Sequence, residues 1–258
     1  MNCGPTLSAD DFTEDCLLGG RLRLRQPRKG HRVGHDAMLL AAATAAQPGD
    51  RVVDFGAGVG GAGLALGCRV AGIELVLLEI APELAALARQ NAVANGIAAT
   101  VHELDIEAGA AAFAAAGLPP DSADRVLMNP PFHDGARHRG SPDESRRRAH
   151  VAGEDTLTLW LHAARRLLKS GGELTLIWRA DGLSEVLAAL SRGFGSVAIL
   201  PVHGAPGAAA IRVLVRAVKG GRAPLVLHPG LLLAEPGGAP SAAADAVLRA
   251  GQPLPLGR

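Results

Sequence analysis

Aromatic residues are scarce in this sequence: they make up 3% of the 258 residues, and tyrosine is absent. This scarcity excludes a single-strand binder built on rows of stacked aromatic side chains. Cysteine is scarce as well. Cys3, Cys16 and Cys68 form no CxxC pair, and they are too few and too scattered for a disulfide framework or a zinc site. We therefore expect a protein of a reducing compartment that needs no metal.

Long apolar runs and an excess of one charge are also missing. The longest uncharged stretch, residues 193–211, contains Pro201 and Pro206 and cannot cross a membrane as a helix. Met1–Asp15 carries acidic residues and no basic segment, unlike a secretory signal. The sequence thus predicts a cytoplasmic protein without a membrane partner. Because 26 basic residues nearly balance 25 acidic ones, affinity for a polyanion must come from local clusters of charge.

Short apolar runs alternate with helical patterns along most of the chain. We expect seven strands, at residues 51–55, 73–79, 100–104, 124–129, 173–178, 196–202 and 211–218. Between them lie helical patterns, one of which begins at Pro82 and another of which ends at Gly171-Gly172. This alternation predicts an α/β fold, a doubly wound and mostly parallel sheet with helices on both faces. Ligands of such sheets bind at the carboxyl ends of the strands.

Two segments outside this core have patterns of their own. Leucine and arginine alternate strictly over Arg21–Arg25 after Gly19-Gly20, which predicts a β-hairpin packed against the domain. Residues 133–153 form a long insertion after the fourth strand, and the spacing at Ser141–Glu144 predicts a short helix inside it.

The last part of the chain, from about Glu235, is rich in Pro, Gly and Ala, and we expect it to be poorly structured apart from one short helix. The chain therefore divides into three parts. They are an N-terminal extension with a basic hairpin (1–35), a ligand-binding α/β domain (36–220) and a C-terminal tail (221–258).

A glycine-rich turn follows the first strand of this domain. Asp54 precedes Gly56, Ala57, Gly58 and Gly60, which fit the pattern GxGxG; with Gly61 the turn also fits GxGxxG, the dinucleotide pattern. Glycines let the backbone turn tightly and approach a ligand, and the next helix begins with free N–H groups. An acidic residue two positions before the first glycine is usual in methyltransferases and rare in dinucleotide enzymes.

Two acidic residues end the next strands. Glu79 closes the second strand, where a carboxylate can accept both hydroxyls of a ribose, as in NAD and S-adenosylmethionine sites. The alternative is a solvated strand end that caps the Pro82 helix. Asp105 follows the third strand and could accept a hydrogen bond from an adenine amino group, or be an ordinary surface acid.

Asn129, Pro130, Pro131 and Phe132 end the fourth strand, at the same edge of the sheet. Two successive prolines fix the backbone and remove donors, so that nearby carbonyls are held outward. Asn129 adds a side-chain acceptor, and Phe132 adds a face for a planar group. Together they suit a flat amide or an aromatic amine, whose N–H groups Asn129 and the Pro130 carbonyl would accept.

DFGAGVG, Glu79 and NPPF resemble the motifs of class I S-adenosylmethionine-dependent methyltransferases that modify planar nitrogens. Gly30–Leu40 (GHRVGHDAMLL) resembles the segment before the glycine motif in bacterial tRNA (valine) adenine-N6 methyltransferases. The resemblance implies a Rossmann-like methyltransferase sheet, S-adenosylmethionine as cofactor with Asp36 beside it, and adenine N6 in tRNA as the target.

Several alternatives stay open. NPPFHDG also resembles ribosomal RNA guanine-N2 methyltransferases, and protein glutamine N5-methyltransferases share the chemistry, although they usually have Tyr in place of Phe132. A dinucleotide-dependent oxidoreductase would explain the glycines but not NPPF. A non-catalytic RNA-binding relative is a further alternative, and the sequence does not determine the oligomeric state.

Basic residues form two clusters, which we interpret as phosphate contacts of an RNA substrate; an ordinary solvated face is the alternative. The first consists of Arg21, Arg23, Arg25, Arg28, Lys29 and Arg32; the second, in the insertion, of Arg137, Arg139, Arg146, Arg147 and Arg148.

Overall fold

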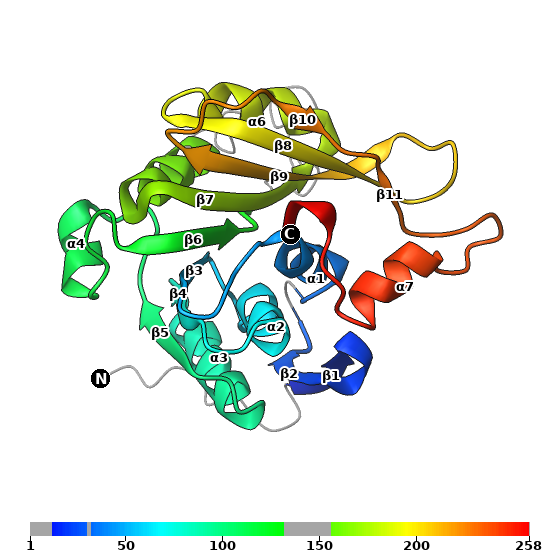
Figure 1. Cartoon of the computed structure of the whole chain (residues 1–258). Helices are drawn as coiled ribbons and strands as arrows, with labels where there is room; N and C mark the ends of the chain where they lie inside the picture. Colours follow the sequence, from blue (N-terminus) through cyan, green and yellow to red (C-terminus); the bar gives the residue numbers. More distant parts are fainter. Residues whose placement is uncertain (1–11, 30–31, 132–155, 258) are drawn as a thin grey trace, which may run out of the picture.

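The computed structural model describes residues 12–29, 32–131 and 156–257. Its centre is a nine-stranded sheet (Figure 1) in which seven strands follow the order β5-β4-β3-β6-β7-β9-β8. β9 is antiparallel to β7 and β8, and the other pairs are parallel. This confirms the predicted α/β fold with a doubly wound and mostly parallel sheet. The strands are β3 (Arg51–Phe55), β4 (Glu74–Glu79), β5 (Ala99–Glu103), β6 (Ala123–Met128), β7 (Leu168–Arg179), β8 (Phe194–His203) and β9 (Ala210–Lys219).

The strand order reverses between β3 and β6, which lie side by side in the middle of the sheet. From β3 the chain continues to β4 and β5 on one side, and from β6 to β7 on the other. Val52–Phe55 are all buried because helices cover both faces of the sheet. A crevice for a ligand is expected outside the carboxyl ends of these two strands.

Helices cover the two faces through two separate apolar clusters (Figure 1). One cluster joins the sheet to α1 (His35–Ala43), α2 (Gly61–Arg69) and α3 (Pro82–Ala94). The other joins it to α4 (Ala110–Ala115), a helix over residues 156–167 and α6 (Leu183–Leu190), which follows the 3-10 turn η3 (Ala180–Gly182). The predicted start of α3 at Pro82 is confirmed.

The boundary between the helix at 156–167 and β7 differs from the expectation. The helix ends before Leu168, and β7 begins there instead of after the Gly171-Gly172 pair. Gly171, with φ +77°, and Gly172 lie inside β7, where the register against β6 shifts between Ala123 and Arg125. A glycine pair inside a strand therefore marks an irregularity here and does not end a helix.

The predicted hairpin is present as β1 (Phe12–Leu17) and β2 (Leu22–Pro27), joined by the 3-10 turn η2 (Leu18–Gly20). Leu22 and Leu24 are buried, and Arg23 and Arg25, which alternate with them, are exposed, as the pattern predicts.

Two asparagines, Asn91 of α3 and Asn95 directly after it, bind the free edge of β2. Asn91 accepts a hydrogen bond from the Arg25 amide (2.8 Å) and donates to the carbonyls of Arg25 (3.0 Å) and Val59 (2.9 Å). One helical turn later, Asn95 makes the same pair of hydrogen bonds with the Arg23 backbone. Helix α3 thus substitutes for a neighbouring strand and fixes the hairpin.

The expectation of a poorly structured C-terminal segment is wrong for residues 235–257. Before this segment, β10 (Val226–Leu227) and β11 (Leu231–Leu232) extend the sheet beside β8. Within it, α7 (Ala242–Leu248), the one short helix expected, contacts α1. Leu254 and Leu256, at the 3-10 turn η4 (Pro255–Gly257), are buried in the core. A few well-spaced apolar side chains order this segment despite its Pro, Gly and Ala content.

None of the helices in the described part of the chain has the length and apolar character that a membrane crossing requires. Within the same residues, no group of three His, Cys, Asp or Glu side chains is placed to hold a metal ion. The predicted insertion at 133–153, its short helix and the second basic cluster lie outside the described residues.

Candidate active site

The glycine-rich turn connects β3 to α2 at the carboxyl end of the sheet. Gly56, Gly58 and Gly60 have φ of +66°, +57° and +92°, the left-handed region that favours glycine. Gly61 is already helical and is needed for another reason: a Cβ there would lie 2.8 Å from both methyl groups of Val33. The turn therefore follows the GxGxG spacing, and the segment before α1 packs directly against it.

An indole ring lies under the first glycine. A Cβ on Gly56 would lie 2.5 Å from Cη2 of Trp160, a buried residue of the helix at 156–167. Trp160 also meets Phe55 edge-to-face, with ring centroids 6.4 Å apart. The sequence showed Trp160 only as a residue at helical spacing, because nothing local indicates a contact with a turn about a hundred residues earlier in the chain.

Glu79 is held at the turn by backbone donors. Its Oε2 accepts from the Gly58 amide and its Oε1 from the Ala81 amide, both at 2.8 Å. The side chain is 7% exposed, so the alternative of a solvated strand end is wrong, although the bond to Ala81 does fix the start of α3. Each carboxylate oxygen keeps a second lone pair, which leaves two acceptors for a pair of hydroxyl groups.

Asp54 lies deeper, with 2% exposure, and its Oδ2 accepts from the Gly63 amide at 2.8 Å. Burial raises the pKa of Asp54 to about 7; the charge of Glu79 adds to the rise, and the Gly63 hydrogen bond opposes it. The carboxyl therefore fastens the first turn of α2 to the end of β3. A Cβ on Gly63 would lie 2.4 Å from Cδ2 of Leu77, so no larger residue fits at this junction.

Asp105 and Asp36 lie farther out on the same edge. Asp105 is exposed, and its Oδ1 accepts from the Glu107 amide at 2.9 Å. Asp36, in the first turn of α1, pairs with Nε of Arg212 at 2.9 Å. Arg212 lies opposite Arg179, the last residue of β7. Contact of either aspartate with the cofactor stays a prediction.

The Asn-Pro-Pro segment follows β6 directly beside the glycine turn, because Met128 pairs with Phe55 in the sheet. Pro130 is buried and Pro131 exposed. The Oδ1 atom of Asn129 is buried and has no hydrogen-bond partner among the described residues. Leaving a buried acceptor unpaired costs about 1–3 kcal/mol, so a donor from a ligand would stabilise this atom; the role of Asn129 stays a prediction. Phe132, the fourth residue of the motif, lies outside the described residues.

Comparison with known proteins decides between the cofactors that the glycine pattern left open. The pattern of the methyltransferase small domain family matches residues 31–204. The chain belongs to this family. It is an S-adenosylmethionine-dependent methyltransferase, and the oxidoreductase alternative is excluded. The site fits this cofactor, because Glu79 offers two acceptors beside the turn and the left-handed glycines let the backbone approach a ligand there.

Two relatives are more specific. The chain is 32% identical over 131 residues to ribosomal RNA small subunit methyltransferase C of Pseudomonas syringae pv. syringae, a match that covers 50% of this chain and 32% of that protein. It thus spans about a third of the length of this curated relative. A solved structure described as a predicted O-methyltransferase of Agrobacterium tumefaciens is 33% identical, with a TM-score of 0.68 over 82% of this chain and 94% of that one.

A third likeness concerns the fold alone. A solved S-adenosylmethionine-dependent O-methyltransferase of Thermotoga maritima is 18% identical, with a TM-score of 0.53 over 76% of this chain and 69% of that one.

Proposed function

We propose that the protein methylates an exocyclic amino group of a nucleobase in RNA, with N6 of adenine in tRNA as the first candidate. The observation that carries the proposal is the buried, unpaired Oδ1 of Asn129 beside the glycine turn. An amide oxygen in that position accepts a hydrogen bond from an N–H group. An exocyclic amine offers such a donor, whereas a hydroxyl group that has lost its proton has no donor left.

The residues of the segment would make the amine more reactive by holding its protons. The lone pair of such an amine is delocalised into the ring, which makes it a poor nucleophile. If Asn129 and the Pro130 carbonyl accept its two N–H groups, the lone pair localises on nitrogen. The buried Pro130 fixes the direction of that carbonyl, and Phe132 would stack on the base.

S-adenosylmethionine supplies a methyl group on a positively charged sulfur, open to in-line attack by nitrogen. Gly56–Gly60 and Glu79 would hold it at the carboxyl end of β3. The chain's contribution is therefore mainly alignment, which can lower a barrier by about 7–11 kcal/mol at best. The base must leave its stack to enter the site, which costs least in a single-stranded loop.

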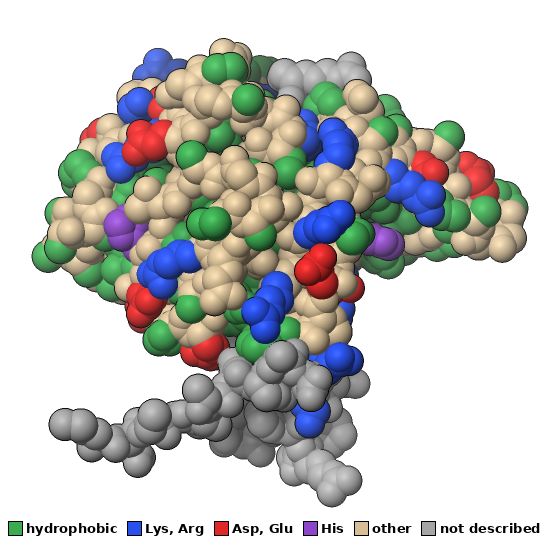
Figure 2. Space-filling view, turned by 90° about the horizontal axis from the view of Figure 1, so that it is seen from below, with side chains coloured by type: hydrophobic (Ala, Val, Ile, Leu, Met, Phe, Trp, Pro, Cys, Tyr) green, Lys and Arg blue, Asp and Glu red, His purple; other side chains and the backbone are tan. Residues whose placement is uncertain are grey.

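An RNA substrate is supported by the curated relative, whose name gives ribosomal RNA as its substrate, and by basic side chains on the hairpin. Arg23 and Arg25 are exposed there, but Arg32 is paired with Asp15 (2.6 Å) on β1. On the face seen in Figure 2, Lys and Arg side chains are spread among acidic ones. We infer that a few separate cations, rather than one continuous patch, hold the phosphates.

A second candidate target is an amino group of ribosomal RNA, which the curated relative favours. Incubation with methyl-labelled S-adenosylmethionine and separated tRNA and ribosomal RNA, followed by nucleoside analysis, distinguishes the two. N6-methyladenosine in tRNA would support the first candidate, and N2-methylguanosine in ribosomal RNA the second. Label found only on ribose hydroxyls, or only on protein, would contradict the proposal.

Asn129→Ala tests the mechanism. We expect single-turnover methyl transfer at saturating RNA and cofactor to fall by roughly 100- to 1,000-fold, the effect of removing one oriented polar group elsewhere, while cofactor affinity stays unchanged. Asn129→Asp keeps the shape and the acceptor, so its rate should lie between that of the parent and that of Asn129→Ala. A rate for Asn129→Ala close to that of the parent would exclude the role given to this residue.

A further inference from the structure

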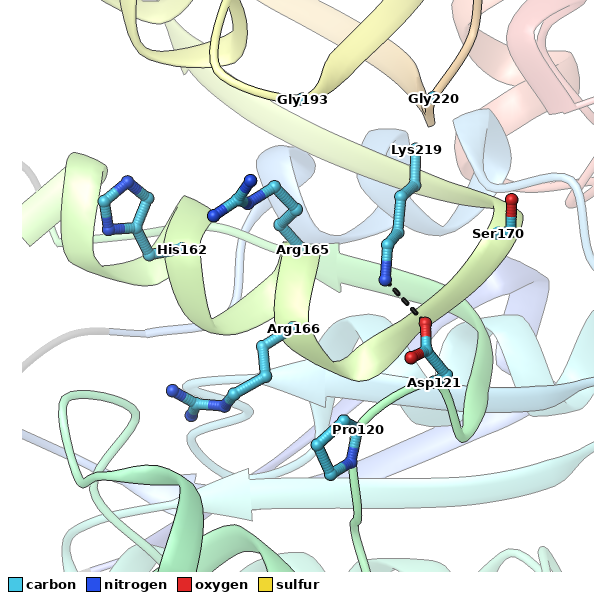
Figure 3. A pocket seen from close by; sticks show the side chains of 9 residues that line it. All are labelled: Pro120, Asp121, His162, Arg165, Arg166, Ser170, Gly193, Lys219 and Gly220. Atoms are coloured by element: carbon cyan, nitrogen blue, oxygen red, sulfur yellow. Dashed lines mark hydrogen bonds and ion pairs between the residues drawn. The ribbon is translucent and has the colours of Figure 1, made fainter.

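A cavity of about 630 Å³ opens at the edge of the sheet opposite the active site (Figure 3). Asp121 lies two residues before β6, Ser170 is near the start of β7, and Lys219 is the last residue of the antiparallel β9. The helix at 156–167 and the turn at Gly193 complete its wall. Since β6 and β3 have 5–6 residues, at about 3.3 Å each, roughly 17–20 Å separates the two edges.

The ionisable side chains that line this cavity are mostly basic. It is lined by His162, Arg165, Arg166 and Lys219 and by a single acid, Asp121. That acid already pairs with Lys219, with Oδ1 and Nζ 2.6 Å apart, as Figure 3 shows. Among the described residues, neither arginine has an acidic partner. The cavity therefore presents two uncompensated guanidinium groups from one helix.

The two guanidinium groups differ in their surroundings. The Arg166 guanidinium lies over the Phe113 ring, 5.0 Å from its centroid. Its Nη2 is buried and has no hydrogen-bond partner among the described residues. Arg165 packs over Gly193, where a Cβ would lie 2.7 Å from the arginine Cδ and 3.1 Å from Nη1. The absence of a side chain at Gly193 thus makes room for the guanidinium.

We propose that this cavity binds a phosphate group. Planar guanidinium forks match phosphate oxygens in bidentate pairs, and two arginines and a lysine at one cavity favour a dianion over a singly charged carboxylate. The cavity volume lies in the range of small-ligand sites, about 300–1,000 Å³. At this distance from the active site, the phosphate cannot be that of the reacting nucleotide. It belongs either to RNA backbone farther along the substrate or to a free phosphate-bearing molecule.

Calorimetric titration with inorganic pyrophosphate tests the site directly and does not depend on the proposed function. We expect the parent to bind, Arg165→Gln to bind at least tenfold more weakly, and Arg249→Gln, which changes an exposed arginine of the C-terminal segment, to bind as the parent does. Affinity for S-adenosylmethionine should be the same in all three, which shows that the variants are folded.

A second measurement identifies the source of the phosphate and rests on the proposed function. Affinity for a single-stranded RNA is measured against salt; the log–log slope should be shallower by about 0.7 in Arg165→Gln if one backbone phosphate is lost. A change in RNA binding assigns the site to RNA, and a loss confined to pyrophosphate assigns it to a small phosphate-bearing molecule. If Arg165→Gln binds both probes as tightly as the parent, the proposal is overturned, whatever the RNA methylation assay shows.

Discussion

The two edges of the central sheet are built in opposite ways. At the carboxyl edge, Asp54 and Glu79 are 2% and 7% exposed and accept hydrogen bonds from backbone amides. At the amino edge, Lys219 pairs with an Asp121 side chain that is 64% exposed, and Arg165 is exposed as well. Rigid, desolvated groups respond strongly to substitution, whereas long side chains in solvent adapt. Stability and cofactor binding should therefore depend on the first edge far more than on the second.

The largest effect on stability should come from Asp54 and should depend on pH. The pKa of Asp54 is about 7 in the folded protein and 3.8 in the absence of burial. Between these values the folded state holds a proton that the unfolded state has lost, so the free energy of unfolding falls as pH rises, by on the order of 4 kcal/mol in total. The loss is complete above pH 7.

Asp54→Asn removes this titration and keeps an acceptor for the Gly63 amide. Urea unfolding between pH 4.5 and 8 should show that the parent loses stability relative to Asp54→Asn as pH rises. Asp121→Asn, at the amino edge, is the matched control and should follow the parent. Parallel curves for Asp54→Asn and the parent would contradict the assignment.

Gly56→Ala and Gly58→Ala separate backbone strain from steric overlap within the glycine turn. Both residues have positive φ, but only Gly56 has a neighbour, Trp160, where the methyl group would go. Gly58→Ala should cost about 1–2 kcal/mol of stability for the left-handed conformation, and Gly56→Ala should cost about 1–3 kcal/mol more for overpacking.

Thermal unfolding measures the two costs in stability. Titration with S-adenosylmethionine should show the same order, with Gly56→Ala binding the cofactor more weakly than Gly58→Ala does. Equal costs for the two variants would mean that Trp160 moves aside without penalty.

The smallest effect is expected at the amino edge. Lys219→Met removes the ion pair with Asp121 and a hydrogen bond to the Leu168 carbonyl (2.7 Å). Because Asp121 is largely in solvent, the cost in unfolding free energy should stay below about 1 kcal/mol. Urea unfolding in low and high salt checks this, and a loss larger than that of Gly58→Ala would reverse the comparison between the edges.

The sequence was sufficient for those parts of the site that lie in short contiguous segments at strand ends. The glycine turn, Glu79 and Asn129 could all be placed at one edge because parallel strands end together. Trp160 under Gly56 and the cavity at Arg165 could not be predicted, since each depends on contacts between distant elements. Asn91 could have been noticed in the sequence, because it is a polar residue one turn after Leu87 on an otherwise buried face of the helix.

Counting residues along the chain led to one wrong expectation and left one prediction, the first basic cluster, incomplete. The composition of the C-terminal segment suggested disorder, but Leu254 and Leu256 are spaced to reach the core. The first basic cluster contains no acid within its own stretch of sequence. In the hairpin, however, Glu14 lies opposite Arg25, and Asp15 binds Arg32. Cross-strand neighbours, not sequence neighbours, determine the charge of such a surface.

The Asn91 side chain has a consequence for how the molecule opens. One amide group binds both the backbone of Arg25 in the hairpin and the Val59 carbonyl in the glycine turn. If β2 detached from α3, the buried Asn91 side chain would lose the Arg25 amide that its oxygen accepts. If the glycine turn loosened, the same side chain would lose the Val59 carbonyl to which it donates. We therefore expect fluctuations of the two segments to be coupled, with the hairpin opening together with the turn.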